Sequence, residues 1–325
     1  MLNGKEIMDR TLSELKKAVV GKEEVAGKIL MAMVAGGHVL LDDIPGVGKT
    51  TLALSFSKAL SLEYKRLQFT PDITPSDITG FMMYNRQSGQ FEYNEGAILC
   101  NLFLADEINR TSAKTQSALL EVMEEGRFTV EAKTHDVPQP FIVIATQNPI
   151  GSIGTQQLPE SQLDRFMICL SMGYPSQEEE SVIMKQRRVH NPLDSIEQIL
   201  DRKDILQMKR EAAEIMVHDA IYDYVSALSA RSRAAETVSL GLSPRGSMAL
   251  IRMTKARAYL SGRNYAIPDD VQNCFQDVAC HRLILSTKAK VGGTTAAQVA
   301  NEILQEVEVP QITEELLCAK NSEGE

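Results

Sequence analysis

The first half of the chain alternates short apolar runs with segments that have helical periodicity. A short apolar run between polar or turn residues is typical of a strand that is buried on both faces. Five such runs are present, at residues 38–41, 65–69, 102–105, 141–146 and 166–171. The alternation of these runs with helices predicts an α/β domain built on a five-stranded, mostly parallel sheet.

One of the intervening segments is a clear crossover helix. Residues 112–125 place Leu119, Leu120, Val122 and Met123 on one face, and Gly126 follows at the position that a helix C-cap favours. The segment lies between the third and fourth apolar runs. It therefore predicts a helix that connects two parallel strands.

The pattern changes after Gly173-Tyr174-Pro175. Ser176 with Glu179 three residues later forms a capping box, which opens a new helix. Beyond it, strand signals nearly vanish, and helical periodicity covers residues 204–231, 246–260 and 269–285. We therefore expect an α/β domain at residues 1–175 and a smaller, all-helical domain at residues 176–325.

Composition narrows the classes of partner and compartment. The chain has 34 basic and 43 acidic residues, a net charge of −9 that argues against nucleic acid as the main partner. Its five cysteines are scattered without a C-x-x-C pair, so no disulfide framework or zinc ribbon is indicated. No apolar run is long enough to cross a bilayer, and the first residues lack an apolar signal region. We expect a cytoplasmic protein without membrane insertion.

The first predicted strand leads into a glycine-rich loop and then a helix. Glycine lets the main chain approach phosphates closely, and a helix N-terminus offers unpaired N–H groups. Lys49 is expected at the β- and γ-phosphates of a nucleotide and Thr50 at Mg²⁺, although Asp43 stands where the strict pattern has its first glycine. The alternative is a glycine turn with an unrelated lysine. The candidate nucleotide-binding residues are Pro45, Gly46, Val47, Gly48, Lys49, Thr50 and Thr51.

Polar residues follow the third and fourth predicted strands. Because ligands bind at the carboxyl ends of parallel strands, Asp106 is expected to hold Mg²⁺ through water and Glu107 to act as the general base. Asn148, after the fourth strand, is placed to hydrogen-bond the γ-phosphate and the attacking water. Taken alone, the two acids fit a solvated strand end, and Asn148 before Pro149 fits a turn.

Two arginines are further candidates for the site. Arg165 directly precedes the fifth strand and is expected to reach the γ-phosphate bound by a neighbouring subunit. Arg245, in Ser243-Pro244-Arg245 at a helix start in the second domain, is expected to fold onto the bound nucleotide. For each arginine separately, a surface salt bridge is the alternative.

In this order, the motifs resemble those of an AAA+ ATPase of the MoxR family, and the likeness spans nearly the whole chain. The segments that carry it are Gln68-Phe69-Thr70-Pro71-Asp72, Pro75-Ser76-Asp77-Ile78-Thr79-Gly80, Leu104-Ala105-Asp106-Glu107-Ile108-Asn109-Arg110, Lys114-Thr115-Gln116-Ser117-Ala118-Leu119-Leu120, Ala145-Thr146-Gln147-Asn148-Pro149, Leu158-Pro159-Glu160-Ser161-Gln162-Leu163-Asp164-Arg165-Phe166, Ser243-Pro244-Arg245 and His281-Arg282-Leu283-Ile284-Leu285-Ser286.

The resemblance implies an activity, an assembly and a class of partner. It implies a chaperone-like ring, a hexamer, that hydrolyses ATP with Mg²⁺. Its implied partners are proteins with von Willebrand factor A domains. Its implied role is maturation of those partners or insertion of a metal cofactor.

The resemblance also assigns a role to each candidate residue by its position. Lys49 and Thr50 match the Walker A motif, and Asp106 and Glu107 match Walker B. In the same way, Asn148 matches sensor 1, Arg165 the arginine finger and Arg245 sensor 2.

The domain organisation is implied in detail as well. The AAA+ nucleotide-binding domain carries inserted hairpins at about residues 80–96 and 127–137, and the all-helical domain is its lid. The first insert has apolar side chains on both sides of a polar turn, which predicts a partner-contacting element without a catalytic role. These side chains are Phe81, Met82, Met83, Tyr84, Phe91 and Tyr93.

Other functions remain as alternatives at this point. A DNA-associated AAA+ motor is disfavoured by the net charge of −9 and by the lack of clustered basic and aromatic residues. A scaffold that binds ATP without hydrolysis is disfavoured by the presence of Glu107, Asn148 and Arg165. A motor subunit like that of magnesium chelatase shares the first insert, but its resemblance to this chain is looser.

Overall fold

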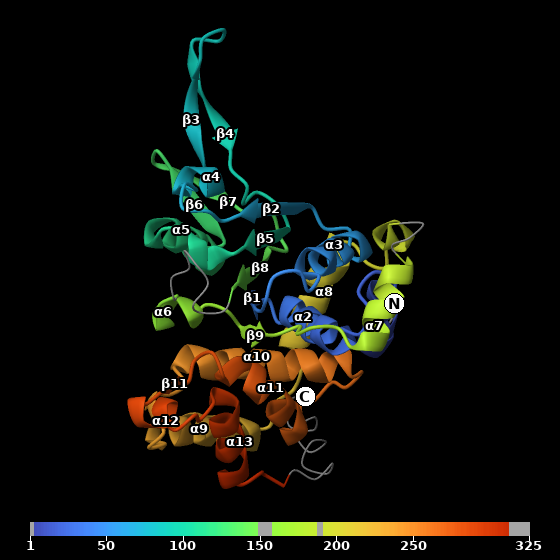
Figure 1. Cartoon of the computed structure of the whole chain (residues 1–325), viewed down its shortest axis with the longest axis vertical. Coiled ribbons are helices and arrows are strands. Elements are labelled where there is room, and N and C mark those ends of the chain that lie inside the picture. Colours follow the sequence, from blue (N-terminus) through green and yellow to red (C-terminus); the bar gives the residue numbers. More distant parts are fainter. Residues whose placement is uncertain (1–2, 149–157, 187–190, 312–325) are drawn as a thin grey trace, which may run out of the picture.

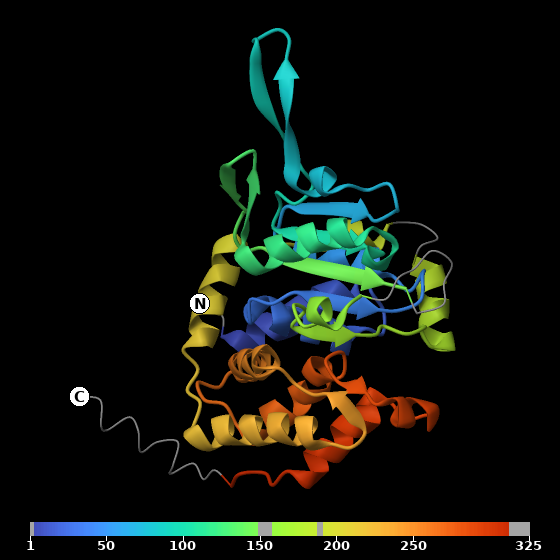
Figure 2. The same cartoon turned by 90° about the vertical axis from the view of Figure 1, so that its left-hand side faces the viewer.

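The computed structural model describes residues 3–148, 158–186 and 191–311, and a five-stranded sheet lies at the centre of its first domain. All strand pairs in this sheet are parallel, and the strand order is β2-β5-β8-β1-β9. The arrowheads of these strands point the same way in Figure 2. The predicted parallel sheet is confirmed. Its strands are β1 (Val39–Asp42), β2 (Tyr64–Gln68), β5 (Leu102–Asp106), β8 (Ile142–Gln147) and β9 (Ile168–Leu170).

Alternate side chains along each strand point to opposite faces of the sheet, and helices cover both faces. On one face, residues such as Leu41 and Leu104 pack with helices α1 (Gly4–Lys16), α2 (Glu23–Val34) and α3 (Lys49–Ala59). On the other face, Leu40 and Phe103 pack with α5 (Ala113–Glu125). Figure 1 shows α5 on one side of the sheet, and α2 and α3 on the other.

The crossover helix α5 begins and ends where the sequence predicts. The Ser112 hydroxyl accepts a hydrogen bond from the backbone N–H of Thr115 at 3.3 Å, and Gly126 closes the helix with a φ of 66°. Two antiparallel hairpins flank this helix in the chain. One joins β3 (Gly80–Asn85) to β4 (Gln90–Glu95), after the short helix α4 (Pro75–Thr79), and extends far from the sheet (Figure 1). The other joins β6 (Arg127–Val130) to β7 (Lys133–Asp136).

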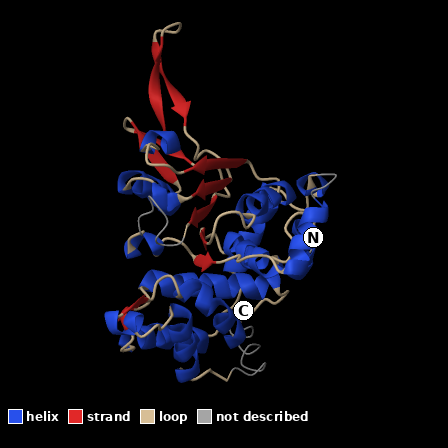
Figure 3. Cartoon of the chain, viewed as in Figure 1, coloured by secondary structure: helices blue, strands red, loops and turns tan. Residues whose placement is uncertain are grey.

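The rest of the described chain is mainly helical, as Figure 3 shows, apart from β9 and one small antiparallel pair of strands. Helix α7 opens with the predicted capping box, in which Ser176 and Glu179 exchange hydrogen bonds of 2.7 and 3.2 Å. The elements from residue 158 onward are α6 (Glu160–Leu163), α7 (Gln177–Gln186), a 3-10 helix (Pro192–Ser195), α8 (Arg202–Ala213), α9 (Asp219–Ala234), β10 (Val238–Leu240), α10 (Pro244–Leu260), α11 (Pro268–Ala279), β11 (Ile284–Leu285), α12 (Thr287–Val291) and α13 (Ala296–Glu306).

Two of the predicted helices differ from the structure. The segment 204–231 is divided between α8 and α9, because the His218 side chain caps a new helix by accepting the N–H of Ala220 at 3.1 Å. The predicted helix 269–285 ends at Ala279, because residues 284–285 pair with β10. Hydrophobic periodicity continues through both breaks, so it could not reveal them.

The second domain lies along the edge of the sheet that is formed by β9. Helix α11 packs against β9, while α10 packs against α1, α2 and α8. This arrangement brings the N-terminus of α10 and the turn after α11 toward the residues that precede β9 (Figure 1). Within the described part of the chain, no helix combines the length and the apolar character that crossing a membrane requires.

Candidate functional site

The loop between β1 and α3 has the geometry of an anion-binding site. Gly46 and Gly48 have φ angles of 87° and 97°, in the left-handed region that favours glycine. Gly48 is also the N-cap of α3, and it has no side chain that could occupy the first N–H groups of the helix. These donors and the positive end of the helix dipole point toward the same place, so the loop is suited to hold phosphate.

Lys49 is the first residue of α3 and is buried. Its ammonium donates a hydrogen bond to the carbonyl oxygen of Asp43 at 2.8 Å. Burial lowers the pKa of Lys49, while the nearby carboxylates of Asp106 and Glu107 act in the opposite direction. The lysine is therefore held between the loop and the acids that follow β5.

Asp43, which departs from the strict phosphate-loop pattern, has a structural role that glycine could not fill. Its buried carboxylate accepts the N–H of Ile44 at 2.9 Å through one oxygen. The other oxygen accepts the N–H of Gly173 at 2.8 Å, and also the N–H of Met172. Asp43 thus joins the beginning of the loop to the chain that leaves β9.

Asp106 is the last residue of β5 and is fixed by the strands on both sides. Its Oδ1 accepts a hydrogen bond from Thr146 Oγ1 on β8 at 2.7 Å. Its Oδ2 accepts one from Arg66 Nη2 on β2 at 2.6 Å. Sequence reasoning missed both partners, although a charged residue inside the second apolar run was a signal for Arg66.

Glu107 has an unusual backbone conformation for a residue other than glycine, with φ 58° and ψ 47°. Such a conformation costs roughly 1–3 kcal/mol and persists where the surroundings enforce it. Its N–H donates to Thr146 Oγ1 at 2.8 Å, which helps to hold the turn. The carboxylate accepts Asn148 Nδ2 at 2.9 Å and Arg110 Nη1 at 2.7 Å. Burial acts to raise the pKa of Glu107, but these two hydrogen bonds and the charges of Arg110 and Lys49 together lower it.

Asn148 follows β8 and is oriented by Asn109, which sequence reasoning did not single out as a separate site residue. Asn109 Nδ2 donates to the Asn148 carbonyl at 3.1 Å, and the Asn148 N–H donates to Asn109 Oδ1 at 3.3 Å. The Oδ1 atom of Asn148 is buried and has no hydrogen-bond partner among the described residues. A buried acceptor of this kind is suited to an O–H donor such as water.

These residues fit a magnesium nucleotide. The hydroxyl of Thr50, in the first turn of α3, and the carboxylate of Asp106 are oxygen ligands of the kind that Mg²⁺ takes alongside water and phosphate. Within the described residues, no group of three or more His, Cys, Asp or Glu side chains could hold a metal by protein ligands alone.

The two candidate arginines lie at the opposite ends of the strands from the phosphate loop. Arg165 Nε donates to Glu124 Oε2 at 2.9 Å, and Arg245 donates to the other oxygen of the same carboxylate. The hydrogen bond from Arg165 lowers the pKa of Glu124, and the charge of Arg245 adds to this effect. A cavity of about 340 Å³ is lined by all three residues, and also by residues 36–38 and Met167, which directly precede β1 and β9. The arginines therefore lie near the N-terminal ends of the strands.

This placement differs from the expectation for Arg245. The phosphate loop follows the carboxyl end of β1, whereas Arg245 lies near the residues that precede β1. The structure does not bring Arg245 onto the nucleotide site of its own chain. Both arginines do form the ion pair that was the alternative for each, but they share one carboxylate, which indicates a common role.

Comparisons with known proteins agree with this geometry. Residues 38–168 match the family model described as ATPase family associated with various cellular activities (AAA), and residues 230–305 match the AAA lid domain. The uncharacterized protein YeaC of Bacillus subtilis is 43% identical over 94% of this chain and 95% of its own length. A solved structure from Cytophaga hutchinsonii has a TM-score of 0.88 and 34% identity, covering 95% of this chain and 96% of that one.

A second relative names the family. Chaperone MoxR1 of Mycobacterium tuberculosis is 39% identical over 94% of this chain and 83% of its own length. Nucleotide binding follows from the AAA domain, which in this chain has the parallel sheet and the helical lid described above. The chain belongs to the MoxR family of AAA+ ATPases.

Proposed function

We propose that this protein hydrolyses ATP with Mg²⁺, at sites that are completed by neighbouring copies in a ring, and uses the reaction to remodel partner proteins. One observation carries the proposal. The lysine and the acids lie where the strands of the sheet end, and the two arginines lie where the strands begin. Phosphoryl transfer requires both sets of groups around one phosphate. Two copies of the chain supply both sets when the strand ends of one copy face the strand beginnings of the other.

The loop residues bind the nucleotide. The N–H groups at the start of α3 and the Lys49 ammonium, which exchanges its bond to the Asp43 carbonyl, take the β- and γ-phosphates. Thr50 and Asp106 would hold Mg²⁺, Asp106 through water while it keeps its hydrogen bonds to Thr146 and Arg66. When bound, the metal neutralises the negative charge of the phosphates.

Glu107 and Asn148 act on the attacking water. Asn148 Oδ1 accepts one O–H of the water, and its Nδ2 keeps Glu107 in place. Glu107 accepts a proton from the water while the water oxygen bonds to the γ-phosphorus. The bond between that phosphorus and the β–γ bridging oxygen breaks, and ADP leaves with the electron pair.

Arg165 and Arg245 act on the nucleotide of the neighbouring copy. They exchange the Glu124 carboxylate for the γ-phosphate, and their positive charges stabilise the negative charge that the phosphate oxygens carry in the transition state. The ring, its six-fold size and the remodelling role come from the family resemblance, and the relative named as a chaperone supports the last of these. Proteins with von Willebrand factor A domains are the proposed partners, and insertion of a metal cofactor into them is the more specific role.

A mixing experiment tests the shared site. Arg165→Ala and Glu107→Gln proteins are each expected to bind ATP and to hydrolyse it poorly. When the two are mixed under conditions in which subunits exchange, sites that pair an intact Glu107 with an intact Arg165 form again. Turnover should then recover in proportion to such pairs. If the mixture exchanges subunits and remains inactive, the proposed trans role of Arg165 is wrong.

A further inference from the structure

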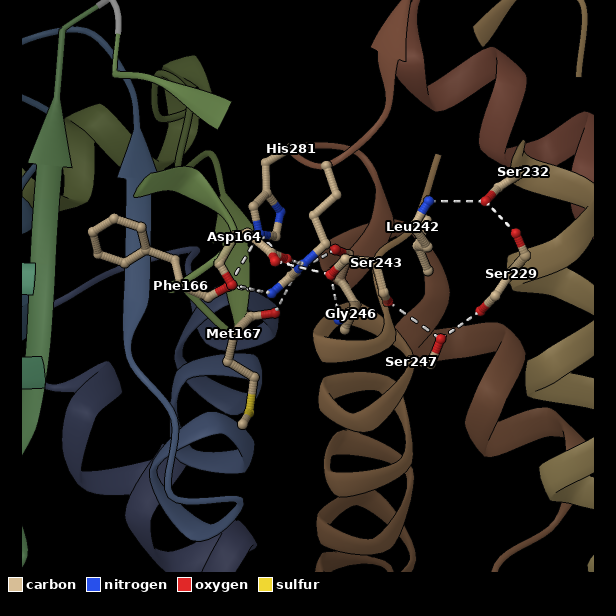
Figure 4. A network of polar contacts seen from close by, with 12 residues as sticks. Asp164, Phe166, Met167, Ser229, Ser232, Leu242, Ser243, Gly246, Ser247 and His281 are labelled. Carbon is tan, nitrogen blue, oxygen red and sulfur yellow. Dashed lines mark hydrogen bonds and ion pairs between the residues drawn. The ribbon is translucent and has the colours of Figure 1, made fainter. Parts of the chain in front are cut away.

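A buried arginine outside the predicted site connects the segments that carry Arg165 and Arg245. We call the region of these two arginines, where the strands begin, the arginine edge. Arg282 lies in the turn between α11 and β11, and its side chain is only 3% exposed. Its Nε donates to Asp164 Oδ1 at 2.7 Å, and its Nη2 donates to the Phe166 carbonyl at 2.6 Å. Its Nη1 donates to the carbonyls of Met167 at 3.2 Å and Val278 at 2.5 Å. Figure 4 shows Asp164, Phe166 and Met167, which precede β9, beside Ser243 at the start of α10.

Asp164 extends this network to the helix that carries Arg245. Its second oxygen, Oδ2, accepts the hydroxyl of Ser243 at 2.8 Å. Ser243 is the N-cap of α10, and the same hydroxyl accepts the N–H of Gly246 at 3.1 Å. One carboxylate therefore connects the residue before Arg165 with the residue two positions before Arg245.

The network continues behind the cap into α9. The Ser247 hydroxyl donates to the Ser243 carbonyl at 3.4 Å and bonds with the Ser229 hydroxyl at 2.8 Å (Figure 4). From the same helix, the Ser232 hydroxyl accepts the N–H of Leu242 at 3.0 Å. The start of α10 is thus held from two sides, by Asp164 and by α9.

Stability alone does not explain why this position holds an arginine. A buried ion pair can often be replaced by apolar side chains without loss of stability, because desolvation offsets the attraction. Burial acts to lower the pKa of Arg282, against the hydrogen bond and charge of Asp164. What the guanidinium adds is direction, since its planar set of donors fixes several acceptors at once.

The backbone segments that carry the two candidate arginines are therefore held in place, while their guanidinium groups can exchange their ion-pair partner. The side chains of Arg165 and Arg245 are 30% and 40% exposed and meet at Glu124, which is itself 37% exposed. An exposed ion pair contributes little to stability and is easily exchanged. Two arginines whose backbone positions are fixed and whose shared carboxylate can be replaced are able to bind one incoming anion together.

We propose that Asp164 and Arg282 are positioning residues that hold Arg165 and Arg245 at a fixed separation, so that both reach one terminal phosphate on the neighbouring copy. This inference rests on the proposed function. It goes beyond it in assigning a role to two residues to which the proposed function gives none.

The first test is Arg282→Lys, which retains the positive charge and removes the planar set of donors. We expect ATP turnover to fall about tenfold or more, as a displacement of about 1 Å at a reacting group does. ATP affinity, measured with a fluorescent nucleotide, should change less than about twofold, because the variant's own phosphate loop is intact. Mixing with Glu107→Gln protein should restore turnover, as for Arg165→Ala. Weakened binding without recovery in the mixture would overturn the inference.

A combination of variants tests whether Arg282 acts through the two arginines. Arg282→Lys should reduce turnover no further when it is added to a chain that already carries Arg165→Ala and Arg245→Ala. A further, additive loss would show a separate role for Arg282 and contradict the inference.

A milder pair of variants gives the same answer if Arg282→Lys does not fold. Ser243→Ala removes the bond to Asp164 together with a helix cap, whereas Ser286→Ala removes the corresponding cap of α12, where Ser286 accepts the N–H of Ala289 at 3.4 Å. We expect Ser243→Ala to lower turnover severalfold and Ser286→Ala to leave it unchanged. Equal effects of the two variants would reduce the network to a stabilising element and overturn the proposal.

The outcomes separate the inference from the function on which it rests. If Arg165→Ala retains full turnover, the proposed shared site is wrong. If Arg165→Ala lowers turnover while folded Arg282→Lys and Ser243→Ala proteins retain it, only the positioning role is wrong.

Discussion

The two ends of the strands in the central sheet carry different sets of groups. Where the strands end, at the acidic edge, Lys49 lies near the carboxylates of Asp106 and Glu107. Where the strands begin, at the arginine edge, Arg165 and Arg245 share the carboxylate of Glu124. Each edge holds half of what phosphoryl transfer requires, and the sheet keeps the halves apart. A chain with this division is suited to work with copies of itself.

The edges also differ in what holds them rigid. At the acidic edge, one hydroxyl from the sheet, Thr146 Oγ1, contacts both Asp106 and the backbone of Glu107. At the arginine edge, the corresponding support comes from the second domain, through Ser243 and Arg282. Movement of the second domain should therefore change the arginine edge and leave the acidic edge intact.

The largest expected effects are at the acidic edge. Lys49→Ala should abolish tight ATP binding, because it removes the cation that attracts the phosphates. Glu107→Gln should retain binding and lose about 10²- to 10⁴-fold in turnover, because it removes the base that activates water. Equilibrium binding with a fluorescent nucleotide and a phosphate-release assay measure the two effects. Hydrolysis by Glu107→Gln at the unchanged rate would rule out this base.

A variant of Thr146 tests the rigidity of the acidic edge. Thr146→Val keeps the shape of the side chain but leaves the half-buried N–H of Glu107 without its acceptor, at a cost of about 1–3 kcal/mol in stability. We expect a decrease in turnover of about tenfold or more as Glu107 shifts. Thr129→Val, on the hairpin strand β6, is the matched control and should change neither quantity. If turnover follows the control, Thr146 does not position Glu107.

The arginine edge should have the stronger response to acid, through His38. This buried histidine accepts the N–H of Val143 at Nδ1, at 3.0 Å, and its Nε2 lies 2.9 Å from the Met123 carbonyl, so the neutral ring fits the site. Burial is the main reason that its pKa falls from 6.5 to about 4. Between these values the unfolded chain binds the extra proton, so stability is complete above pH 6.5 and decreases as the pH falls toward 4.

This loss of stability should reach about 3 kcal/mol, because a tenfold change in proton affinity between the folded and unfolded chains corresponds to about 1.4 kcal/mol. Denaturant unfolding at a series of pH values measures it. His38→Asn should be less stable at neutral pH and should lose this part of the pH dependence, whereas His135→Asn on β7 should keep it. Identical pH profiles for the native protein and His38→Asn would contradict the assignment.

The smallest effect on hydrolysis is expected away from both edges, on the β3–β4 hairpin. Tyr84 and Phe91 are 54% and 65% exposed, whereas Tyr93 stacks on His135 and donates to the Thr79 carbonyl at 2.5 Å. Replacing Tyr84 and Phe91 with serine should leave ATP turnover within about twofold and weaken binding of the partner. A loss of turnover equal to the loss of partner binding would make the hairpin a structural element.

The sequence predicted those parts of the molecule that local patterns determine. Four of the five strands follow from apolar runs, whereas β2 includes Lys65 and Arg66, and α5 follows from its Ser112 and Gly126 caps. Lys49, Asp106 and Glu107 were found because each directly follows a strand or a glycine turn. The position of a residue at a strand end is enough to place it at an edge of the sheet.

Contacts between distant segments were not predictable in this way. Nothing in the segment around Glu124 indicates that its carboxylate binds Arg165 and Arg245, because those contacts depend on how the second domain packs against β9. The same is true of Arg282, which belongs to one of the family-like segments but has no local signal for its burial. The contact of Arg245 with Glu124 could not be predicted for the same reason.

The pairing of both arginines with Glu124 has a consequence for selectivity. Two unpaired arginines on the surface would attract many of the polyanions in a cell, including nucleic acids and free nucleotides. Glu124 occupies them with a single negative charge, so a competing anion must both carry more charge and be presented in the correct orientation. A terminal phosphate held rigidly by another copy meets both conditions, whereas a freely diffusing anion meets only the first. Under the proposed function, the carboxylate would therefore limit binding by the arginine pair to a phosphate that a neighbouring copy presents.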